Sequence, residues 1–354
     1  MSGYSRHITT VLEDLSVELI WEIFDHMWYH EIYTAFQGLN SHVDSIIQGM
    51  KHRIDGAKMQ KYTDHVLPIS INVDNVVFIK LGWEIGEFLL KYPLEIFSKS
   101  LRSLKLDNFK KQYISETIDK LACLKRLTRL TIRFSRVYSY EPDVNELRHV
   151  FDVVFREATS LKHLNLFHTH SGEEALLIDL HTITTNLQTI AIYTLRLNDF
   201  IRLLSYVPNV KLMEMSVSIN HGGITILPSE QIPTMGSLCQ LSLFIWRGLE
   251  LQPHIQSLLQ KMPNMKQLTI QGYGDWSHVD GERWENILKT FCKRIKKFSL
   301  HITINVSKSS RCVTDIESKW RTAFWLEINT AVKRSYPYTF DLLFSVETNI
   351  TVVQ

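Results

Sequence analysis

Two histidines in the stretch HTH, His168 and His170, are the side chains in this 354-residue sequence whose type and spacing most readily suggest chemistry. Glu173 and Glu174 follow closely, and a zinc ion accepts imidazole and carboxylate ligands together. Histidine pairs in loops are nevertheless far more often solvated than bound to a metal. We therefore expect a solvated pair here, with no metal site and no cofactor.

The motifs of the common enzyme classes are missing from the sequence. It contains no GxGxxG or GxxxxGK[ST] phosphate-binding loop, no HExxH metal-binding pair and no GxSxG nucleophile elbow. We therefore expect a chain that is not catalytic by itself. Its four cysteines lie far apart and form no CxxC pair, which favours reduced thiols and a cytoplasmic or nuclear location.

The overall charge and hydropathy give no support to two classes of partner. Lys and Arg number 39 against 37 for Asp and Glu, which gives a net charge of +2. Such a balanced composition lacks the basic excess typical of nucleic-acid-binding proteins. No apolar run approaches the ~18 residues that a membrane span requires. We expect neither nucleic acid nor a membrane as partner.

Basic residues gather locally in the stretch KRLTRLTIRFSR, at 125–136. Arg129 and Arg133 alternate along a predicted strand and would project to one side of it, together with Lys105 of a neighbouring strand. Because arginine pairs with carboxylates and phosphates in bidentate geometry, this cluster could accept an acidic or phosphorylated segment of a partner protein. The alternative is an ordinary solvated surface, as most charged runs are.

A recurrent pattern supplies the elements that would position these residues. Apolar residues occupy positions 1, 4 and 6 of a six-residue frame, and helical patterning follows each frame. The frames start at residues 76, 101, 127, 161, 187, 210, 238, 265 and 295. A strand and a return helix repeated at this spacing predict an α/β solenoid, with a curved parallel sheet inside and helices outside. An ordinary α/β domain is the alternative.

Positions 3, 5 and 7 of each frame point away from the buried side of the strand and would form the inner face of the sheet. Long polar residues with isolated aromatic residues are typical of a recognition surface. A polar sheet face that is merely solvated remains the alternative. The residues that we expect to contact a partner protein are Lys105, Arg129, Arg133, His163, Phe167, Tyr193 and Phe244.

The first fifty residues predict three short helices. The first begins after Ser16, a good N-cap, and the other two cover 30–37 and 41–48. Residues 51–75 read as a connector, with one strand at 68–73. The apolar arc of the first helix is roughly 200° wide, about twice what a helix with one buried face needs. This helix therefore requires neighbours on two sides.

The N-terminal stretch DLSVELIWEIFDHMWYHEIYTAFQGLNSHVDSII resembles an F-box. The residues that match its pattern are Leu15, Glu18, Leu19, Ile20, Ile23, Phe24, Ile32, Ala35, Phe36, Leu39 and Val43. Ser16 stands where the motif usually has proline, and the tryptophan common near its end is absent. Residues 76–354 resemble irregular leucine-rich repeats. Their ninth-position asparagine is replaced by Phe109, Ser135 and Thr169 in three units.

Together the two resemblances are those of the F-box/leucine-rich-repeat substrate receptors of cullin-based SCF ubiquitin ligases. They imply an F-box over 1–50, a connector over 51–75 and a solenoid over 76–354. One side of the first helix would close the F-box core and the other would dock a Skp-family adaptor, and through it cullin. The solenoid would bind a client protein for ubiquitination. The residues implied in adaptor binding are Leu15, Leu19, Ile20, Ile23, Phe24, Ile32, Phe36, Leu39 and Val43.

A non-catalytic repeat scaffold is the other interpretation of the same sequence. In that case the N-terminal helices would only cap the open end of the solenoid, since terminal repeats need a cover. The width of the apolar arc favours docking, because a cap needs one apolar face.

Overall fold

The computed structural model of the chain forms two compact units, Met1–Thr131 and Ile132–Gln354, which are described separately here. The structure describes residues 12–56, 58, 72–82, 85–109, 113–134, 144–167, 183–184, 186–218, 232–246, 251–274, 276–305, 318–327, 331–338 and 341–349.

The first unit begins with three α-helices and continues with strands that alternate with helical segments. Its elements are η1 (Leu12–Asp14), α1 (Val17–Asp25), α2 (Tyr29–Phe36), α3 (Ser41–Gly49), β1 (His52–Asp55), η2 (Val73–Asn75), β2 (Val76–Leu81), α5 (Ile85–Lys91), η3 (Leu94–Phe97), β3 (Ser103–Phe109), α6 (Ile114–Asp119) and η5 (Lys120–Cys123). The three N-terminal helices lie where the sequence predicts them. Ser16 occupies the N-cap of α1, and the Asn40 side chain caps α3 by accepting the Val43 N–H at 2.9 Å.

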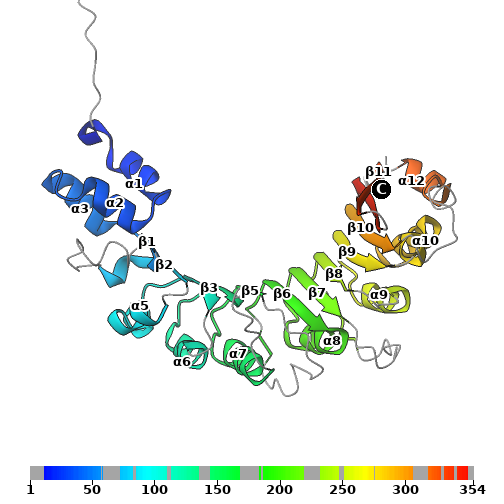
Figure 1. The fold of residues 1–354 in the computed structure, drawn as a ribbon, viewed down its shortest axis with the longest axis horizontal. Helices are drawn as coiled ribbons and strands as arrows, with labels where there is room; N and C mark the ends of the chain where they lie inside the picture. Colours follow the sequence, from blue (N-terminus) through cyan, green and yellow to red (C-terminus); the bar gives the residue numbers. More distant parts are fainter. Residues whose placement is uncertain are drawn as a thin grey trace, which may run out of the picture. The chain divides into compact units, whose positions relative to one another are not determined.

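Strands β1, β2 and β3 pair in parallel, in chain order. Strand β1 lies inside the predicted connector and was not expected there. The strand predicted at 68–73 falls largely outside the described residues, and its last residue, Val73, begins η2 instead. The helical segments α5 and α6 lie on one side of these strands (Figure 1).

The second unit contains most of the sheet. Strand β4 (Arg129–Phe134) spans the boundary between the units, and the elements that follow are α7 (Val144–Arg156), β5 (His163–Phe167), β6 (Thr189–Arg196), α8 (Leu197–Tyr206), β7 (Leu212–Ser218), β8 (Gln240–Ile245), α9 (Leu251–Gln260), β9 (Gln267–Gly274), η7 (Trp276–Val279), α10 (Gly281–Phe291), β10 (Lys297–Asn305), α12 (Ala323–Glu327), β11 (Ala331–Tyr338) and β12 (Asp341–Asn349).

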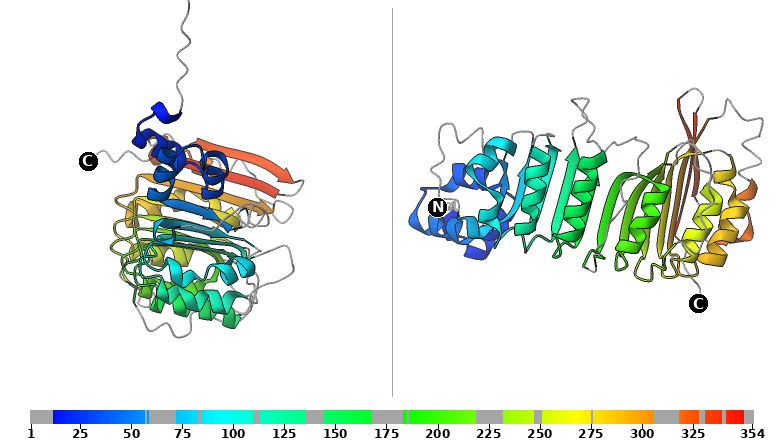
Figure 2. Two further views of the ribbon diagram at one scale, coloured as in Figure 1. Left: turned by 90° about the vertical axis from the view of Figure 1, so that its left-hand side faces the viewer. Right: turned by 90° about the horizontal axis from the view of Figure 1, so that it is seen from below.

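Each strand from β5 to β9 pairs in parallel with the next one in the chain. Helices α8, α9 and α10 lie along one face of these strands (Figure 1), and they stand in front of the strands when the unit is seen from below (Figure 2, right). The prediction of an α/β fold with a mostly parallel sheet is confirmed.

The nine frames correspond to nine strands, β2 to β10, each of which begins at the frame start or two residues after it. Every apolar residue at positions 1, 4 and 6 of these frames is buried. Positions 4 and 6 therefore face the core as predicted. Because a shift of one residue would turn these side chains to the opposite face, the alternation also fixes the register of each strand.

Backbone hydrogen bonds join equivalent positions of successive frames. The carbonyl of Lys211, at the second frame position, accepts the N–H groups of Cys239 and Gln240 in the next frame, at 2.9 and 3.0 Å. The same doubled contact recurs at the carbonyls of Cys239 and Lys266. Neighbouring frames thus meet in a constant register.

A polar residue just before several of the frames adds a second connection that the sequence analysis missed. Asn186 donates to the carbonyl of Thr159 at 2.7 Å, and Asn264 donates to the carbonyl of Gly236 at 2.6 Å. Arg294 extends this series by donating to the side-chain oxygen of Asn264 at 2.6 Å. In the first unit, Ser100 and Arg126 bond in the same way to carbonyls 27 residues earlier. This side-chain ladder links neighbouring frames without the ninth-position asparagine of common leucine-rich repeats.

The frame pattern did not predict the end of the sheet, where β12 pairs antiparallel with β10 and β11 pairs antiparallel with β12. This hairpin continues the sheet beyond β10, whose edge would otherwise expose unpaired backbone groups. Nearby, the indole N–H groups of Trp284, Trp320 and Trp325 donate to the carbonyls of His278, Val279 and Gly281. The rings of Trp320 and Trp325 lie 4.5 Å apart and cover the start of α10.

The ladder predicts the effect of one substitution. Asn264→Ala removes a donor to Gly236 and an acceptor for Arg294, so we expect the free energy of unfolding to fall by about 1–3 kcal/mol. Chemical denaturation followed by circular dichroism measures the change. Gln260→Ala, on the exposed end of α9, is the control and should alter stability by less than about 0.5 kcal/mol. Equal effects of the two substitutions would contradict a structural role for the ladder.

Candidate functional site

A row of contacting side chains crosses the non-helical face of the sheet in the second unit. The guanidinium of Arg133, on β4, lies 4.5 Å from the ring centre of Phe167 on β5. Phe167 in turn stacks on Tyr193 of β6, with ring centres 4.1 Å apart and planes 14° from parallel. The Tyr193 hydroxyl donates to the carboxylate of Glu214 on β7. Four neighbouring strands thus contribute to one surface, termed here the aromatic row.

The electrostatics of the aromatic row follow from its order. Burial raises the pKa of Tyr193, and the hydrogen bond to Glu214 and the charge of that carboxylate raise it further, while Arg133 opposes them. Tyr193 therefore stays neutral and remains a hydrogen-bond donor under ordinary conditions. The row carries a cation at one end, a carboxylate at the other and two stacked aromatic rings between them. It offers apolar and charged contacts to a polypeptide.

A second aromatic group lies on β8 and β9. Phe244 contacts Trp246 and Tyr273 edge-on, with ring centres 5.2 and 6.5 Å away. The Trp246 indole N–H donates to the hydroxyl of Ser216 at 2.6 Å, and its ring is exposed. The sequence analysis missed Trp246 and Tyr273 because it followed each frame only to position 7. Continuing the alternation by two residues would have placed both on this face.

The predicted client-binding residues do not form one continuous site within either unit. The structure brings Arg133, Phe167 and Tyr193 together, whereas Phe244 belongs to the second aromatic group. His163 is half-buried at the start of β5. In the first unit, Arg129 is exposed at the start of β4.

Lys105 pairs with Asp107 at 2.9 Å, also in the first unit. Its charge is therefore already matched within the chain. The predicted basic cluster of Lys105, Arg129 and Arg133 thus has one member that is neutralised and another, Arg133, that covers an aromatic ring.

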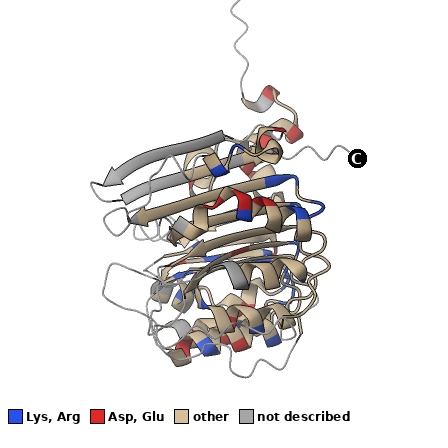
Figure 3. Ribbon diagram, turned by 90° about the vertical axis from the view of Figure 1, so that its right-hand side faces the viewer, with Lys and Arg blue, Asp and Glu red and all other residues tan. Residues whose placement is uncertain are grey.

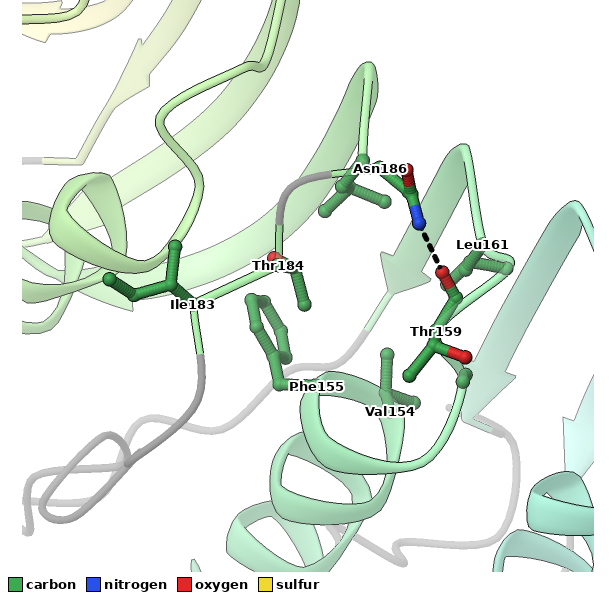
Figure 4. A pocket seen from close by; sticks show the side chains of 9 residues that line it. Val154, Phe155, Thr159, Leu161, Ile183, Thr184 and Asn186 are labelled. Atoms are coloured by element: carbon green, nitrogen blue, oxygen red, sulfur yellow. Dashed lines mark hydrogen bonds between the residues drawn. The ribbon is translucent and has the colours of Figure 1, made fainter.

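Within the part of the chain that the structure describes, the features relevant to metal or small-molecule binding are potential metal ligands and a small hollow. Within those residues, no three His, Cys, Asp or Glu side chains gather as metal ligands. His168 and His170 lie outside them. A hollow of about 70 Å³ beside the end of α7 is lined by uncharged residues, and its Asn186 amide is engaged by Thr159 (Figure 4). It is a gap in the packing that carries no reactive group.

Helix α1 presents two apolar surfaces in the first unit. Ile20 and Phe24 are 0% and 1% exposed, and the ring of Phe24 lies 4.9 Å from that of Phe36 on α2. Leu19 and Ile23, one turn apart on another side of the helix, are 49% and 41% exposed. Large apolar side chains exposed next to each other are a common mark of an interaction site.

Burial divides the residues implied in adaptor binding into three groups. Ile20, Phe24, Ile32 and Val43 belong to the core of the three helices, where a partner cannot touch them, so a direct contact role does not fit these four. Leu15 and Phe36 are half-buried. Leu19, Ile23 and Leu39 are exposed and remain available for contact.

The same three helices also pack on the first strands. Tyr29 contacts His52 of β1, with ring centres 4.6 Å apart. The guanidinium of Arg53 lies over the rings of Trp28 and Phe78, at 5.0 and 5.4 Å. The helices therefore cover the beginning of the sheet, which is what the capping interpretation requires.

Comparison with known proteins does not assign the chain to a family. A scan against models of protein families and a search of curated proteins both find no match. Among the described residues, no helix combines the length and apolar character needed to cross a membrane.

The packing of His52 predicts a pH dependence of stability. Burial lowers the pKa of His52 from its ordinary 6.5 to about 4, so between these values the unfolded chain binds the proton more readily than the folded one. We expect stability to fall as pH decreases through this window, by up to about 3 kcal/mol. His52→Phe keeps a ring against Tyr29 and removes the titrating group, so its denaturation midpoint should depend less on pH. His42→Phe, at an exposed position of α3, should keep the wild-type slope. Identical slopes for wild type and His52→Phe would refute this role.

Proposed function

We propose that this chain is the substrate-recognition subunit of an SCF-type ubiquitin ligase. Its N-terminal helices would dock a Skp-family adaptor, and the non-helical sheet face would bind the client protein. The observation that carries the proposal is the division of α1 into a buried apolar side, Ile20 and Phe24, and an exposed apolar side, Leu19 and Ile23. The F-box resemblance implies this same division.

The repeated frames support the second half of the proposal. Successive strands pair in parallel at equivalent positions, and the side-chain ladder recurs at intervals of 27 or 28 residues in Asn186 and Asn264. This regularity fits a leucine-rich-repeat-like solenoid better than an ordinary α/β domain, whose units share no common frame. The aromatic row and the second aromatic group lie on the face that such a solenoid uses for recognition.

The mechanism of such a receptor is proximity. Holding a client lysine near a ubiquitin-conjugating enzyme raises its effective concentration, and the receptor itself contributes no catalytic group and no cofactor. The aromatic row would anchor the client through apolar contacts with the half-buried rings of Phe167 and Tyr193 and through the charges of Arg133 and Glu214. The chain would work in the cytoplasm or the nucleus, where such ligases act.

A repeat scaffold unrelated to ubiquitin is the second candidate, and the packing of α2 on β1 favours it. The contact between Tyr29 and His52 gives the helices a capping role whether or not an adaptor binds. Capping alone, however, does not require Leu19 and Ile23 to be apolar, since both point away from the core. The two candidates therefore differ in what the exposed side of α1 does.

The proposal predicts the outcome of a co-purification. Leu19→Asp/Ile23→Asp places two charges on the exposed side of α1 and leaves the buried side intact. We expect its affinity for a purified Skp-family adaptor, with or without cullin, to fall at least about 100-fold, because charges replace apolar contacts at the interface. Leu90→Asp, at a position 87% exposed on α5, is the matched control and should bind as wild type does.

Thermal unfolding of all three proteins shows whether the fold is kept. Loss of the complex in the double variant alone, with unchanged unfolding, supports the receptor. If the wild-type chain is folded but binds no adaptor, the N-terminal helices act only as a cap. The repeat scaffold is then the better assignment.

A further inference from the structure

Lysine and arginine residues gather where β7, β9 and β10 begin, at the opposite end of the strands from Trp246 and Tyr273. The residues of this surface, termed the lysine edge, are Lys211, Lys266, Lys293, Arg294, Lys296 and Lys297, and all six are exposed. Figure 3 marks Lys and Arg in blue along this end of the strands, most clearly at the turn that leads into β10.

The frame register places three of these charges in one row across the strands, with Cys239 of the frame between Lys211 and Lys266. Lys211, Lys266 and Lys296 hold the same second position in their frames, and the carbonyl of Lys266 accepts the N–H of Lys296 at 2.7 Å. From β7 to β10 the edge spans three strand spacings of about 4.8 Å each, or about 14 Å in all. An extended peptide covers that distance in about five residues.

The ion pairs among the side chains that the structure describes do not include the lysine edge. Within the part of the second unit that the structure describes, the ion pairs lie elsewhere, for example between Asp152 and Arg156 on α7 and between Glu285 and Lys289 on α10. The six edge residues form no ion pair with any described side chain. A row of like charges that repel one another adds nothing to folding, which points to a partner of opposite charge.

We propose that the lysine edge binds an acidic segment of a partner protein, about five residues of which lie across the starts of β7 to β10. Lysine is a strongly hydrated point charge that suits separate carboxylates, whereas phosphate groups are typically read by arginine forks. The edge has one arginine, Arg294, whose guanidinium already donates to Asn264 at 2.6 Å. The residue types therefore favour carboxylates over phosphorylated side chains.

Other polyanions fit the lysine edge less well. Single-stranded nucleic acids need aromatic platforms on which bases stack, and none of the six residues is aromatic. Membrane surfaces need an apolar anchor in addition to basic residues. None of the large apolar side chains described as exposed lies in the turns that carry the edge. This inference does not depend on the proposed ligase function.

The test is a binding titration of the full chain with a fluorescein-labelled oligoglutamate peptide. We expect binding that weakens as ionic strength rises from about 0.01 to about 0.15 M, because the charges are exposed to solvent. Lys266→Glu/Lys296→Glu should weaken it at least about tenfold. Arg283→Glu/Arg321→Glu, at exposed positions elsewhere in the unit, makes the same change in net charge and should weaken it less than about twofold.

Three other results would overturn the proposal. One is equal loss of binding in the two double variants, which would mean that net charge alone attracts the peptide. The second is tighter binding of a single-stranded oligonucleotide, and the third is tighter binding of phosphatidylserine vesicles. Either of these would assign the lysine edge to a nucleic acid or a membrane surface instead. Circular dichroism of both variants confirms that the fold is kept.

Discussion

The hydrogen bonds between equivalent backbone positions of successive frames are the constraint on which the rest of this structure depends. When the carbonyl of Lys211 accepts two N–H groups from the next frame and that of Lys266 repeats the contact, every side chain of one strand is set beside its counterpart in the next. Apolar positions then align into a continuous core, and polar positions align into rows. The aromatic row and the lysine edge are both products of this one register, at two places along the strands.

A parallel sheet built in this way must be finished at its open edges, since unpaired strands expose backbone donors and acceptors. The second unit ends in an antiparallel hairpin, which needs only a short turn, whereas another parallel strand would need a crossover helix. In the first unit, α2 packs on β1 through Tyr29 and His52. The hairpin pairs the backbone of β10, whereas α2 places an aromatic ring against β1.

The sequence predicted the strands well because their burial follows a strict alternation that survives in every frame. It could not predict β1, since four residues with charges at Arg53 and Asp55 carry no such alternation. Nor did it predict the side-chain ladder: a single asparagine before a strand, such as Asn186, resembles any turn residue until the carbonyl beside it is known. Of the candidate site, the residues themselves could be named, but their contacts depend on distances between strands that are far apart in the chain.

The apolar side of α1 and the lysine edge would act on partners by different physics. Burying Leu19 and Ile23 removes apolar surface from water, a contribution that ordinary salt concentrations leave nearly unchanged and that slows dissociation. Exposed lysines instead act over about 10 Å at moderate ionic strength and mainly speed encounter. Partners of the two surfaces should therefore differ in how their association depends on salt. A solution experiment can thus separate the two surfaces without knowing the partners.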